Sequence, residues 1–253
     1  MTGTNRPSPP KRLEWQLARV RDVVAETLHV KSLMLKPASW PGHLPGQHVD
    51  IRLTAEDGYQ AQRSYSISSP PEDELLALTV ERVKDGEVSP YLLDELRVGD
   101  HLELRGPIGG YFVWTGDAMR PVYLLAGGTG ITPLMSMLRH RDRQPSRPPA
   151  LVIYSARTWE DTVYRDELKA MVQRDSNFRL VYALTRQQPE DWMGHRGRIT
   201  KGLLSANWFP PAHNPAIYVC GPTSFVETAV NLLAELGFDP LSIKTERFGP
   251  SGG

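Results

Sequence analysis

The spacing of apolar residues changes near residue 116, and the change predicts two domains of different class. Before this point, short β-prone runs are separated by Pro and Gly turn residues, with one brief helical candidate over 90–96. Strands this short and numerous predict a closed or nearly closed antiparallel β-barrel. After it, apolar runs typical of parallel strands alternate with stretches of helical periodicity, which predicts a doubly wound α/β domain with a parallel sheet. We therefore expect a disordered lead-in over 1–11, a barrel over 12–115 and an α/β domain over 116–253.

The individual strands follow from the same patterns. In the barrel, β-prone runs predict strands at 15–24, 28–35, 47–53, 75–83 and 101–104. In the α/β domain, apolar runs predict strands at 122–126, 150–154, 179–184, 216–220 and 241–245. Ligands of such domains bind at the carboxyl ends of the strands, so the residues that follow these runs are candidates for a nucleotide site.

The charge balance and the cysteine count exclude several classes of protein. The chain has 29 Lys and Arg residues against 29 Asp and Glu residues, which argues against binding to nucleic acid or to a membrane surface. One cysteine cannot build an internal disulfide, a four-cysteine iron–sulfur cluster or a structural zinc site within this chain, so we expect no metal. The first residues lack an apolar signal segment and no apolar run approaches the ~20 residues that span a bilayer, so we expect a cytoplasmic protein.

A polar run inside a β-prone stretch is the first candidate for a ligand site. It consists of Arg63, Ser64, Tyr65 and Ser66. Arg63 and Tyr65 are two residues apart, so in a strand they point to one face. A guanidinium binds pyrophosphate through forked hydrogen bonds, a phenol ring stacks on a flat heterocycle, and a small hydroxyl reaches a ring nitrogen. The run therefore suits a flavin nucleotide, although taken alone it is explained more simply as a serine-rich strand end.

A glycine-rich run directly after the predicted strand at 122–126 is the second candidate. Glycines let a backbone approach a ligand closely, and the amino terminus of a helix binds phosphate. Thr132 and Pro133 predict a helix with Thr132 as its N-cap and Pro133 as its first residue. Pro133 replaces the third glycine of the dinucleotide fingerprint, and a tight turn would need glycine without any ligand. The candidate contacts are Gly128, Thr129, Gly130, Thr132 and Pro133.

Together with Cys220-Gly221-Pro222 after the strand at 216–220, these motifs resemble the ferredoxin-NADP reductase superfamily. Their order and separation match that family over roughly residues 12 to 248. The resemblance implies that the barrel binds FAD, that the α/β domain binds NAD(P)H, and that Ser66 lies at the N5 edge of the flavin. It also implies that Cys220 helps to position the nicotinamide, whereas the residue alone indicates a small buried hydrophobe.

The same resemblance assigns a second phosphate contact. An Asp-Gly-Glu-Val-Ser segment would contact the flavin pyrophosphate through backbone amides and a hydroxyl at Gly86, Val88 and Ser89. An ordinary hairpin or loop explains this segment equally well.

The residues after the strand at 150–154 indicate which nicotinamide nucleotide is used. Ser155, Arg157 and Tyr164 lie where the adenosine 2′ position is normally read, and Arg186 after the next strand is a further candidate. A serine and a guanidinium accommodate a 2′-phosphate, so NADPH is expected over NADH. Nearby acidic residues weaken that expectation.

Phe248, close to the end of the sequence, is the last candidate. Members of the resembling family often place a carboxy-terminal aromatic ring against the flavin, in the space that nicotinamide must enter. The plant-type enzymes end on this ring, whereas here the residues 249–253 follow it. Packing of a phenylalanine that anchors the terminus is an equally simple explanation.

These assignments predict a flavin-dependent oxidoreductase of the ferredoxin-NADP reductase type. It would take a hydride from NADPH onto FAD, in preference to FMN, with Ser66, Cys220 and Phe248 nearest the reacting atoms. Its electrons would pass to an external one-electron carrier, such as a ferredoxin or another small iron–sulfur protein, because the chain lacks cysteines for a cluster of its own. The alternatives are an NAD(P)H:flavin reductase, an NADH-using reductase component of an oxygenase, and a flavin-binding redox sensor without rapid turnover.

Overall fold

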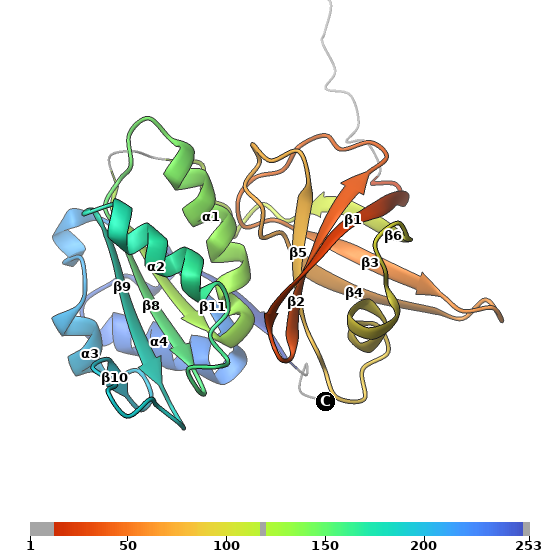
Figure 1. Cartoon of the computed structure of the whole chain (residues 1–253). Coiled ribbons are helices and arrows are strands. Elements are labelled where there is room, and N and C mark those ends of the chain that lie inside the picture. Colours follow the sequence, from red (N-terminus) through yellow and green to blue (C-terminus); the bar gives the residue numbers. More distant parts are fainter. Residues whose placement is uncertain (1–12, 117–119, 250–253) are drawn as a thin grey trace, which may run out of the picture.

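The computed structural model describes residues 13–116 and 120–249, and the predicted lead-in over 1–11 lies outside them. Two six-stranded sheets follow one another along the chain. The first ends at Ile108 and the second starts at Val122, so the predicted change at residue 116 falls between them. Figure 1 shows the first sheet curled into a barrel beside a layered α/β unit. In the described part of the chain, no helix is long and apolar enough to cross a membrane.

The first sheet is antiparallel and closes on itself almost completely. Neighbouring strands pair in the order β4-β3-β6-β1-β2-β5. An isolated bridge between Ile67 and Leu78 joins the two edge strands, β4 and β5. The flavin-type motif, Arg63 to Ser66, lies at the end of β4, directly before this bridge between the two edge strands. The elements are β1 (Gln16–Thr27), β2 (Val30–Pro37), β3 (His48–Thr54), β4 (Gln60–Ser66), β5 (Leu76–Glu81), a single helical turn (Tyr91–Glu95) and β6 (His101–Ile108).

Alternate side chains of the strands fill the barrel. Leu33 and Leu35 of β2 and Val49 and Ile51 of β3 are fully buried and two residues apart in each strand. A slip of one residue would turn these side chains to the solvent face, so their alternation fixes the register of the sheet.

The second sheet is parallel, and helices cover both of its faces (Figure 1). Helices α1 and α2 pack on one face and α3 and α4 on the other. Successive residues of β7 serve the two faces, with Leu124 packed on the α1 side and Leu125 on the α4 side. The structure therefore confirms the predicted fold class, an antiparallel barrel followed by a doubly wound parallel-sheet domain.

The five predicted strands of this domain overlap observed strands, but the last one starts and ends later than expected, and the two-residue strand β10 was not predicted. In spatial order the strands are β10 (His195–Arg196), β9 (Phe178–Leu184), β8 (Ala150–Ala156), β7 (Val122–Gly127), β11 (Ala216–Pro222) and β12 (Ile243–Phe248). The helices are α1 (Ile131–Arg143), α2 (Arg165–Arg174), α3 (Lys201–Ala206) and α4 (Thr223–Glu235), with short helical turns at Gly128–Gly130, Pro211–His213 and Pro240–Ser242.

Helix α1 contacts the barrel just beyond the flavin-type motif. Ser136 Oγ donates a hydrogen bond of 2.7 Å to the carbonyl oxygen of Ser69. Arg139 Nη1 donates one of 2.8 Å to the carbonyl oxygen of Ser68. The same helix follows the glycine-rich run, so these buried contacts fix the position of that run relative to β4.

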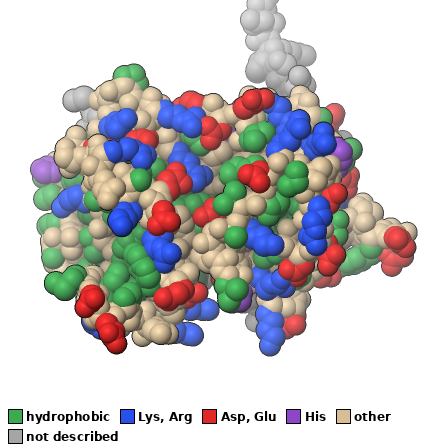
Figure 2. Space-filling view, in the orientation of Figure 1, with side chains coloured by type: hydrophobic (Ala, Val, Ile, Leu, Met, Phe, Trp, Pro, Cys, Tyr) green, Lys and Arg blue, Asp and Glu red, His purple; other side chains and the backbone are tan. Residues whose placement is uncertain are grey.

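Charged side chains of both signs are interspersed over the face shown in Figure 2. Arginines of α1 are ion-paired within the chain, Arg139 with Glu167 at 2.6 Å and Arg143 with Asp73 at 2.5 Å. The Arg143–Asp73 pair is exposed, and exposed pairs contribute little to stability, about 0–1 kcal/mol each. They leave the face shown without a large area of one sign.

Candidate active site

A cleft of about 550 Å³ opens between the barrel and the α/β unit, at the carboxyl ends of the parallel strands. Clefts of this size at such strand ends are where α/β domains bind nucleotides. The barrel contributes the tip of the β1–β2 hairpin and the end of β5, and the α/β unit contributes the ends of β7, β8, β11 and β12. Its lining includes Glu81 from the barrel and Gly128, Thr129, Ser155, Arg157, Asp161, Pro222 and Phe248 from the α/β unit.

The glycine-rich run forms the floor of this cleft because its residues make a very tight turn. Gly128 has φ +56°, a backbone conformation that a residue with a side chain rarely adopts. A Cβ atom on Gly130 would lie 2.2 Å from the carbonyl oxygen of Cys220, so this position needs glycine for packing against β11. Packing against β11 therefore explains the glycine at position 130 without any ligand, whereas Gly128 and Thr129 line the cleft.

The predicted cap of the following helix is wrong. Helix α1 begins at Ile131 with Gly130 as its N-cap, and no side chain caps it. The helical turn at Gly128–Gly130 leads directly into α1, so the helix starts before Thr132 instead of after it. Thr132 is buried in the first turn, and its Oγ1 has no hydrogen-bond partner in the described structure. Pro133 is tolerated there because its missing N–H would be unpaired in any first turn.

Strand β4 presents two of the predicted flavin contacts on one face. Arg63 donates to the carbonyl oxygen of Gln62 over 2.7 Å and to Glu87 Oε2 over 3.3 Å. Tyr65 is half-buried against the barrel core, and this burial raises the pKa of its phenol to about 12, so it stays neutral. Ser66 ends the strand, half-buried, opposite His48 of β3.

Ser64 does not join this face. Its hydroxyl donates a hydrogen bond of 2.7 Å to Asp50 Oδ1, and Asp50 also accepts a bond of 2.6 Å from Arg105. Successive side chains of a strand point to opposite faces, which is why Ser64 is turned away from Arg63 and Tyr65. The Ser64 hydroxyl is thus engaged by Asp50, and the role of Ser64 as a cofactor contact stays a prediction.

The segment around Gly86 is a compact loop with internal bonds. Gly86 donates its N–H to the carbonyl oxygen of Val83 over 3.1 Å, and the Ser89 hydroxyl accepts the N–H of Val83 over 2.9 Å. The side chain of Val88 is buried in the barrel core. Val88 therefore has only its backbone to offer a ligand, and Ser89 has its hydroxyl proton. Both the hairpin explanation and the phosphate explanation remain compatible with this loop.

Cys220 lies beside a carboxyl group that the sequence patterns did not assign. Cys220 and Glu246 are register partners on the adjacent strands β11 and β12, and Sγ lies 3.9 Å from Glu246 Oε2. Burial raises the pKa of the Cys220 thiol well above its usual range, with the neighbouring carboxylate adding to the shift. Burial also raises the pKa of Glu246 to about 7. A neutral thiol and a carboxyl that titrates near neutrality thus lie together at the end of the sheet.

The predicted adenosine contacts separate into two groups. Ser155, which is almost buried, and Arg157, whose side chain is exposed, both line the cleft. Arg186 is exposed, and its backbone N–H donates to the carbonyl oxygen of Arg157 over 2.8 Å, so the two arginines are neighbours. Asp161 lines the same cleft and brings a negative charge to it.

Tyr164 belongs to the interface between the two units and not to the nucleotide site. It has the left-handed conformation φ 58° just before α2, which turns its ring inward, and it is only 4% exposed. Its hydroxyl is hydrogen bonded to the hydroxyl of Thr79 on β5, and the Arg139 guanidinium lies 4.9 Å from its ring. The prediction that Tyr164 reads the adenosine 2′ position is therefore wrong.

Phe248 ends β12 next to the glycine-rich floor. It is the register partner of Pro222, lines the cleft and is 37% exposed. The register of β11 and β12 therefore brings a residue from the end of the described chain to the carboxyl edge of the sheet. Stacking of its ring on a flavin stays a prediction.

Several contacts in and around the site carry no sequence signal. Thr129 Oγ1 donates a hydrogen bond of 2.7 Å to Glu81 Oε2 across the cleft, and Glu246 reaches Cys220 only through the sheet register. Glu87 lies between two donors, accepting from Tyr59 over 2.7 Å as well as from Arg63. A sequence shows neither strand order nor register, so no motif search could pair these residues.

A flavin nucleotide and a nicotinamide nucleotide fit this arrangement. The Arg63 guanidinium donates hydrogen bonds to Gln62 and Glu87, and its remaining N–H groups are available to bind an anion. Near the end of β4, Tyr65 supplies a neutral ring and Ser66 supplies a small hydroxyl group. In the cleft, the ends of β7 and β8 offer Gly128, Thr129, Ser155 and Arg157 to a second nucleotide.

Comparison with known protein families agrees with both halves of the site. Residues 16–113 match the family described as Oxidoreductase FAD-binding domain, and residues 124–231 match Oxidoreductase NAD-binding domain. The glycine betaine monooxygenase reductase subunit of Chromohalobacter salexigens is 36% identical over 208 residues, which cover 81% of this chain and 56% of that protein. The chain therefore spans little more than half the length of this relative.

Two further comparisons cover nearly the whole chain. NADH-cytochrome b5 reductase 1 of Aspergillus terreus is 30% identical over 249 residues, which cover 94% of this chain and 83% of that protein. The solved structure of the flavohem-like FAD/NAD binding domain of nitric oxide dioxygenase from Vibrio cholerae has a TM-score of 0.80 at 26% identity, covering 93% of this chain and 99% of that one.

Proposed function

Since the chain belongs to the ferredoxin-NADP reductase superfamily, we propose that it takes a hydride from NADPH onto bound FAD and passes the electrons to an external one-electron carrier. The carrier class we propose is a small iron–sulfur protein. One observation supports the proposal: the ends of β7, β8 and β11 share a single cleft with the end of β5, and helix α1, which follows the glycine-rich run, is hydrogen bonded to Ser68 and Ser69 just beyond the flavin-type residues of β4. Two cofactor sites that face each other are what direct hydride transfer requires, because the reacting atoms must approach to ~3–3.5 Å.

The residues of the chain supply binding and orientation. Arg63 would hold the flavin pyrophosphate, Tyr65 would lie against the ring system, and Ser66 would reach its N5 edge. Gly128, Thr129 and Pro222 would shape the nicotinamide side, with Cys220 behind them. Bound FAD would supply the chemistry that converts hydride transfer into one-electron transfer.

The preference for NADPH is part of the proposal and is supported by Arg157 and Ser155 in the cleft. A guanidinium can pair with a 2′-phosphate, which NADH lacks. Asp161 in the same cleft supports the opposite choice, because a carboxylate repels that phosphate. The relative named as an NADH-cytochrome b5 reductase supports NADH as the second candidate.

The second candidate function is an NADH-using reductase component of an oxygenase. The relative named as a monooxygenase reductase subunit supports it, although this chain spans only 56% of that protein. Release of reduced free flavin, and a redox sensor that turns over slowly, are the remaining alternatives and are separated by the experiment below.

The experiment is anaerobic rapid mixing of the FAD-loaded protein with NADPH or with NADH, followed at the flavin absorption band. We expect the band to bleach within milliseconds to seconds, and faster at low concentrations of NADPH than of NADH. No bleaching with either nucleotide would contradict an enzyme of this type and favour a redox sensor.

The carrier is then identified by adding an acceptor to the NADPH-reduced protein. We expect reoxidation by a [2Fe–2S] ferredoxin to be faster than by cytochrome c or by free FMN. Fast reduction of free FMN alone would favour the flavin reductase instead.

A further inference from the structure

We propose that the tip of the β1–β2 hairpin forms the barrel wall of the nucleotide site at its adenosine end, and that His29 on this tip contacts the phosphate at the adenosine 2′ position. The inference rests on the proposed function for the identity of the nucleotide. It adds a specificity residue from the barrel to a site whose other candidates at this end, Ser155 and Arg157, come from the α/β unit.

The hairpin tip is a two-residue turn that reaches the cleft between the two units. Leu28 and His29 form the turn, and Thr27 and Val30 pair on either side of it. Figure 1 shows the tip of this hairpin between the barrel and the α/β unit. Thr27 and His29 line the cleft, whereas Leu28 is 90% exposed and does not line it. The turn therefore directs the histidine, and not the leucine, to the cleft.

Buried contacts fix the tip relative to the α/β unit. Val30 is only 5% exposed and belongs to the buried cluster of the α/β unit, together with Leu124 and Ala156. On the barrel side, the carbonyl oxygen of His29 accepts the N–H of Arg82 over 2.9 Å, so the turn is tied to the end of β5. Contacts on both sides give the tip one position, as a binding wall requires.

A second chain of contacts supports the same position. Ser32 Oγ on β2 lies 2.8 Å from Thr79 Oγ1 on β5, and both side chains are buried. Thr79 is in turn hydrogen bonded to the hydroxyl of Tyr164, just before α2. The base of the hairpin is therefore connected to the α/β unit through hydrogen bonds as well as through the packing of Val30.

The hairpin tip and the end of β8 border the same cleft. Ala156 of β8 lines the cleft and shares the buried cluster with Val30, while Ser155 and Arg157 on either side of it line the cleft too. A cleft of about 550 Å³ is in the range that encloses most of the surface of a small ligand. A nucleotide held at Ser155 and Arg157 would therefore have the hairpin tip as a second wall.

The side chains of the barrel wall leave His29 as a donor to a phosphate. The Arg82 guanidinium is ion-paired with Asp94, which does not line the cleft, and Glu81 accepts a hydrogen bond from Thr129. The His29 side chain is exposed, and an imidazole ring carries at least one N–H donor in either protonation state. With Arg157 on the opposite wall, a 2′-phosphate would have donors from both units.

This placement adds to the choice of coenzyme. NADH has a hydroxyl where NADPH has the 2′-phosphate, so a hydrogen bond to that phosphate stabilises only the NADPH complex. The His29 contact would act together with Arg157 and would offset the carboxylate of Asp161 in the same cleft.

The test compares 2′,5′-ADP with 5′-AMP, which share the adenosine and the 5′-phosphate and differ only in the 2′-phosphate. The FAD-loaded full chain is titrated with each by isothermal calorimetry. We expect the unmodified protein to bind 2′,5′-ADP more tightly. His29→Ala should weaken binding of 2′,5′-ADP by about fivefold, the loss of one hydrogen bond, and leave binding of 5′-AMP unchanged. The 5′-AMP titration also checks that the site of the variant is intact.

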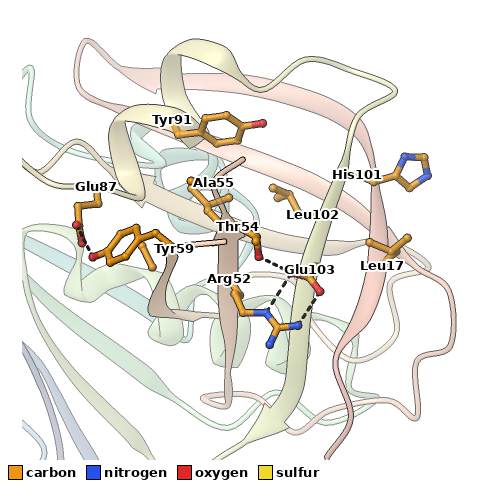
Figure 3. Close-up of a pocket in the computed structure, with 12 residues that line it drawn as sticks. Leu17, Arg52, Thr54, Ala55, Tyr59, Glu87, Tyr91, His101, Leu102 and Glu103 are labelled. Atoms are coloured by element: carbon orange, nitrogen blue, oxygen red, sulfur yellow. Dashed lines mark hydrogen bonds and ion pairs between the residues drawn. The ribbon is translucent and has the colours of Figure 1, made fainter. Parts of the chain in front are cut away.

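Two control variants separate the ring of His29 from its surroundings. Leu28→Ala changes the other residue of the turn, which does not line the cleft. His101→Ala removes an exposed histidine elsewhere on the barrel. Figure 3 shows His101 on β6 at the edge of a separate hollow, which shares no lining residue with the cleft. Both variants should bind 2′,5′-ADP and 5′-AMP as the unmodified protein does.

Four results would overturn the inference. They are equal weakening of both ligands in His29→Ala, no weakening of 2′,5′-ADP in that variant, the same weakening in Leu28→Ala, and no preference for 2′,5′-ADP in the unmodified protein.

Failure of this inference and failure of the proposed function give different results. The titrations contain no nicotinamide, so they report only how the adenosine end binds. A protein whose flavin is bleached by NADPH, but whose His29→Ala variant keeps its affinity for 2′,5′-ADP, would retain the proposed function without the barrel wall. A protein that is not bleached, but whose His29→Ala variant loses that affinity, would retain the nucleotide site without the proposed reaction.

Discussion

Arg63 has the only guanidinium on the flavin face of β4, and in the described structure it forms an ion pair with Glu87. Arg63→Ala should weaken FAD binding by about 1.5–3 kcal/mol, because a charge-assisted contact to the pyrophosphate is lost. Flavin occupancy after gel filtration measures the effect. Arg19→Ala, at an exposed position on β1, should keep full occupancy. A flavin-replete Arg63→Ala protein would remove Arg63 from the site.

Arg157 tests the choice of nucleotide. Arg157→Ala should raise the KM for NADPH by about tenfold and leave the KM for NADH nearly unchanged, because only NADPH has a 2′-phosphate to lose a partner. Steady-state rates with both nucleotides measure the difference. Lys169→Ala, at an exposed position on α2, should change neither value. The same increase for both nucleotides would show that Arg157 does not contact the 2′-phosphate.

Phe248 tests whether the tail gates the cleft. If its ring occupies the space of the nicotinamide, each binding event must displace it, and Phe248→Ser removes that cost. The variant should bind nicotinamide nucleotides more tightly and use NADH better relative to NADPH. Leu241→Ser, which removes an exposed apolar side chain before the same strand, should do neither. Unchanged binding and selectivity in a folded, FAD-replete Phe248→Ser protein would assign the ring to packing alone.

At the scale of elements, the contact between β5 and the start of α2 is a structural joint. Tyr164→Phe removes the hydroxyl that is bonded to Thr79 and keeps the buried ring. Loss of one buried hydrogen bond should lower the free energy of unfolding by about 1–2 kcal/mol. The ratio of KM values for NADPH and NADH should stay the same, because Tyr164 does not line the cleft. Chemical denaturation and steady-state kinetics on the same preparation measure both effects, and a changed ratio would return Tyr164 to the nucleotide site.

For the whole molecule, Glu246 couples stability to pH. Burial raises its pKa to about 7, whereas an unfolded chain has the ordinary value near 4.5. The folded protein therefore keeps a proton that the unfolded chain releases, so this contribution to stability is complete below about pH 4.5 and is lost as pH rises to about 7. Each pKa unit corresponds to about 1.4 kcal/mol, which gives a change of roughly 2–3 kcal/mol over this range.

Glu246→Gln isolates this effect, because glutamine has a similar shape and does not titrate. We expect the difference in the free energy of unfolding between the unmodified protein and Glu246→Gln to fall by that amount between pH 4.5 and pH 7.5. Urea denaturation of the flavin-free proteins measures it. Parallel stability curves over this range would mean that Glu246 is already ionised in the folded protein.

The sequence by itself determined the fold class and the existence of the flavin-type and nucleotide-type motifs. The alternation of Leu33 and Leu35 or of Val49 and Ile51 is local information, because a strand shows its buried face within a few residues. The glycine-rich run is also local, because a tight turn after a buried strand requires glycine whatever surrounds it.

Only the tertiary structure decided which side chains meet. Glu246 faces Cys220 because β12 pairs with β11 in one register, and Tyr164 faces Thr79 because α2 packs beside β5. Both pairs join residues that are far apart in the chain, and strand order and register set them. Thr132 was misassigned for a related reason, since the helical turn before α1 and its packing on β11 start the helix earlier than side-chain preference indicates. Capping preferences are worth about 1 kcal/mol, and burial of a well-packed helix contributes more.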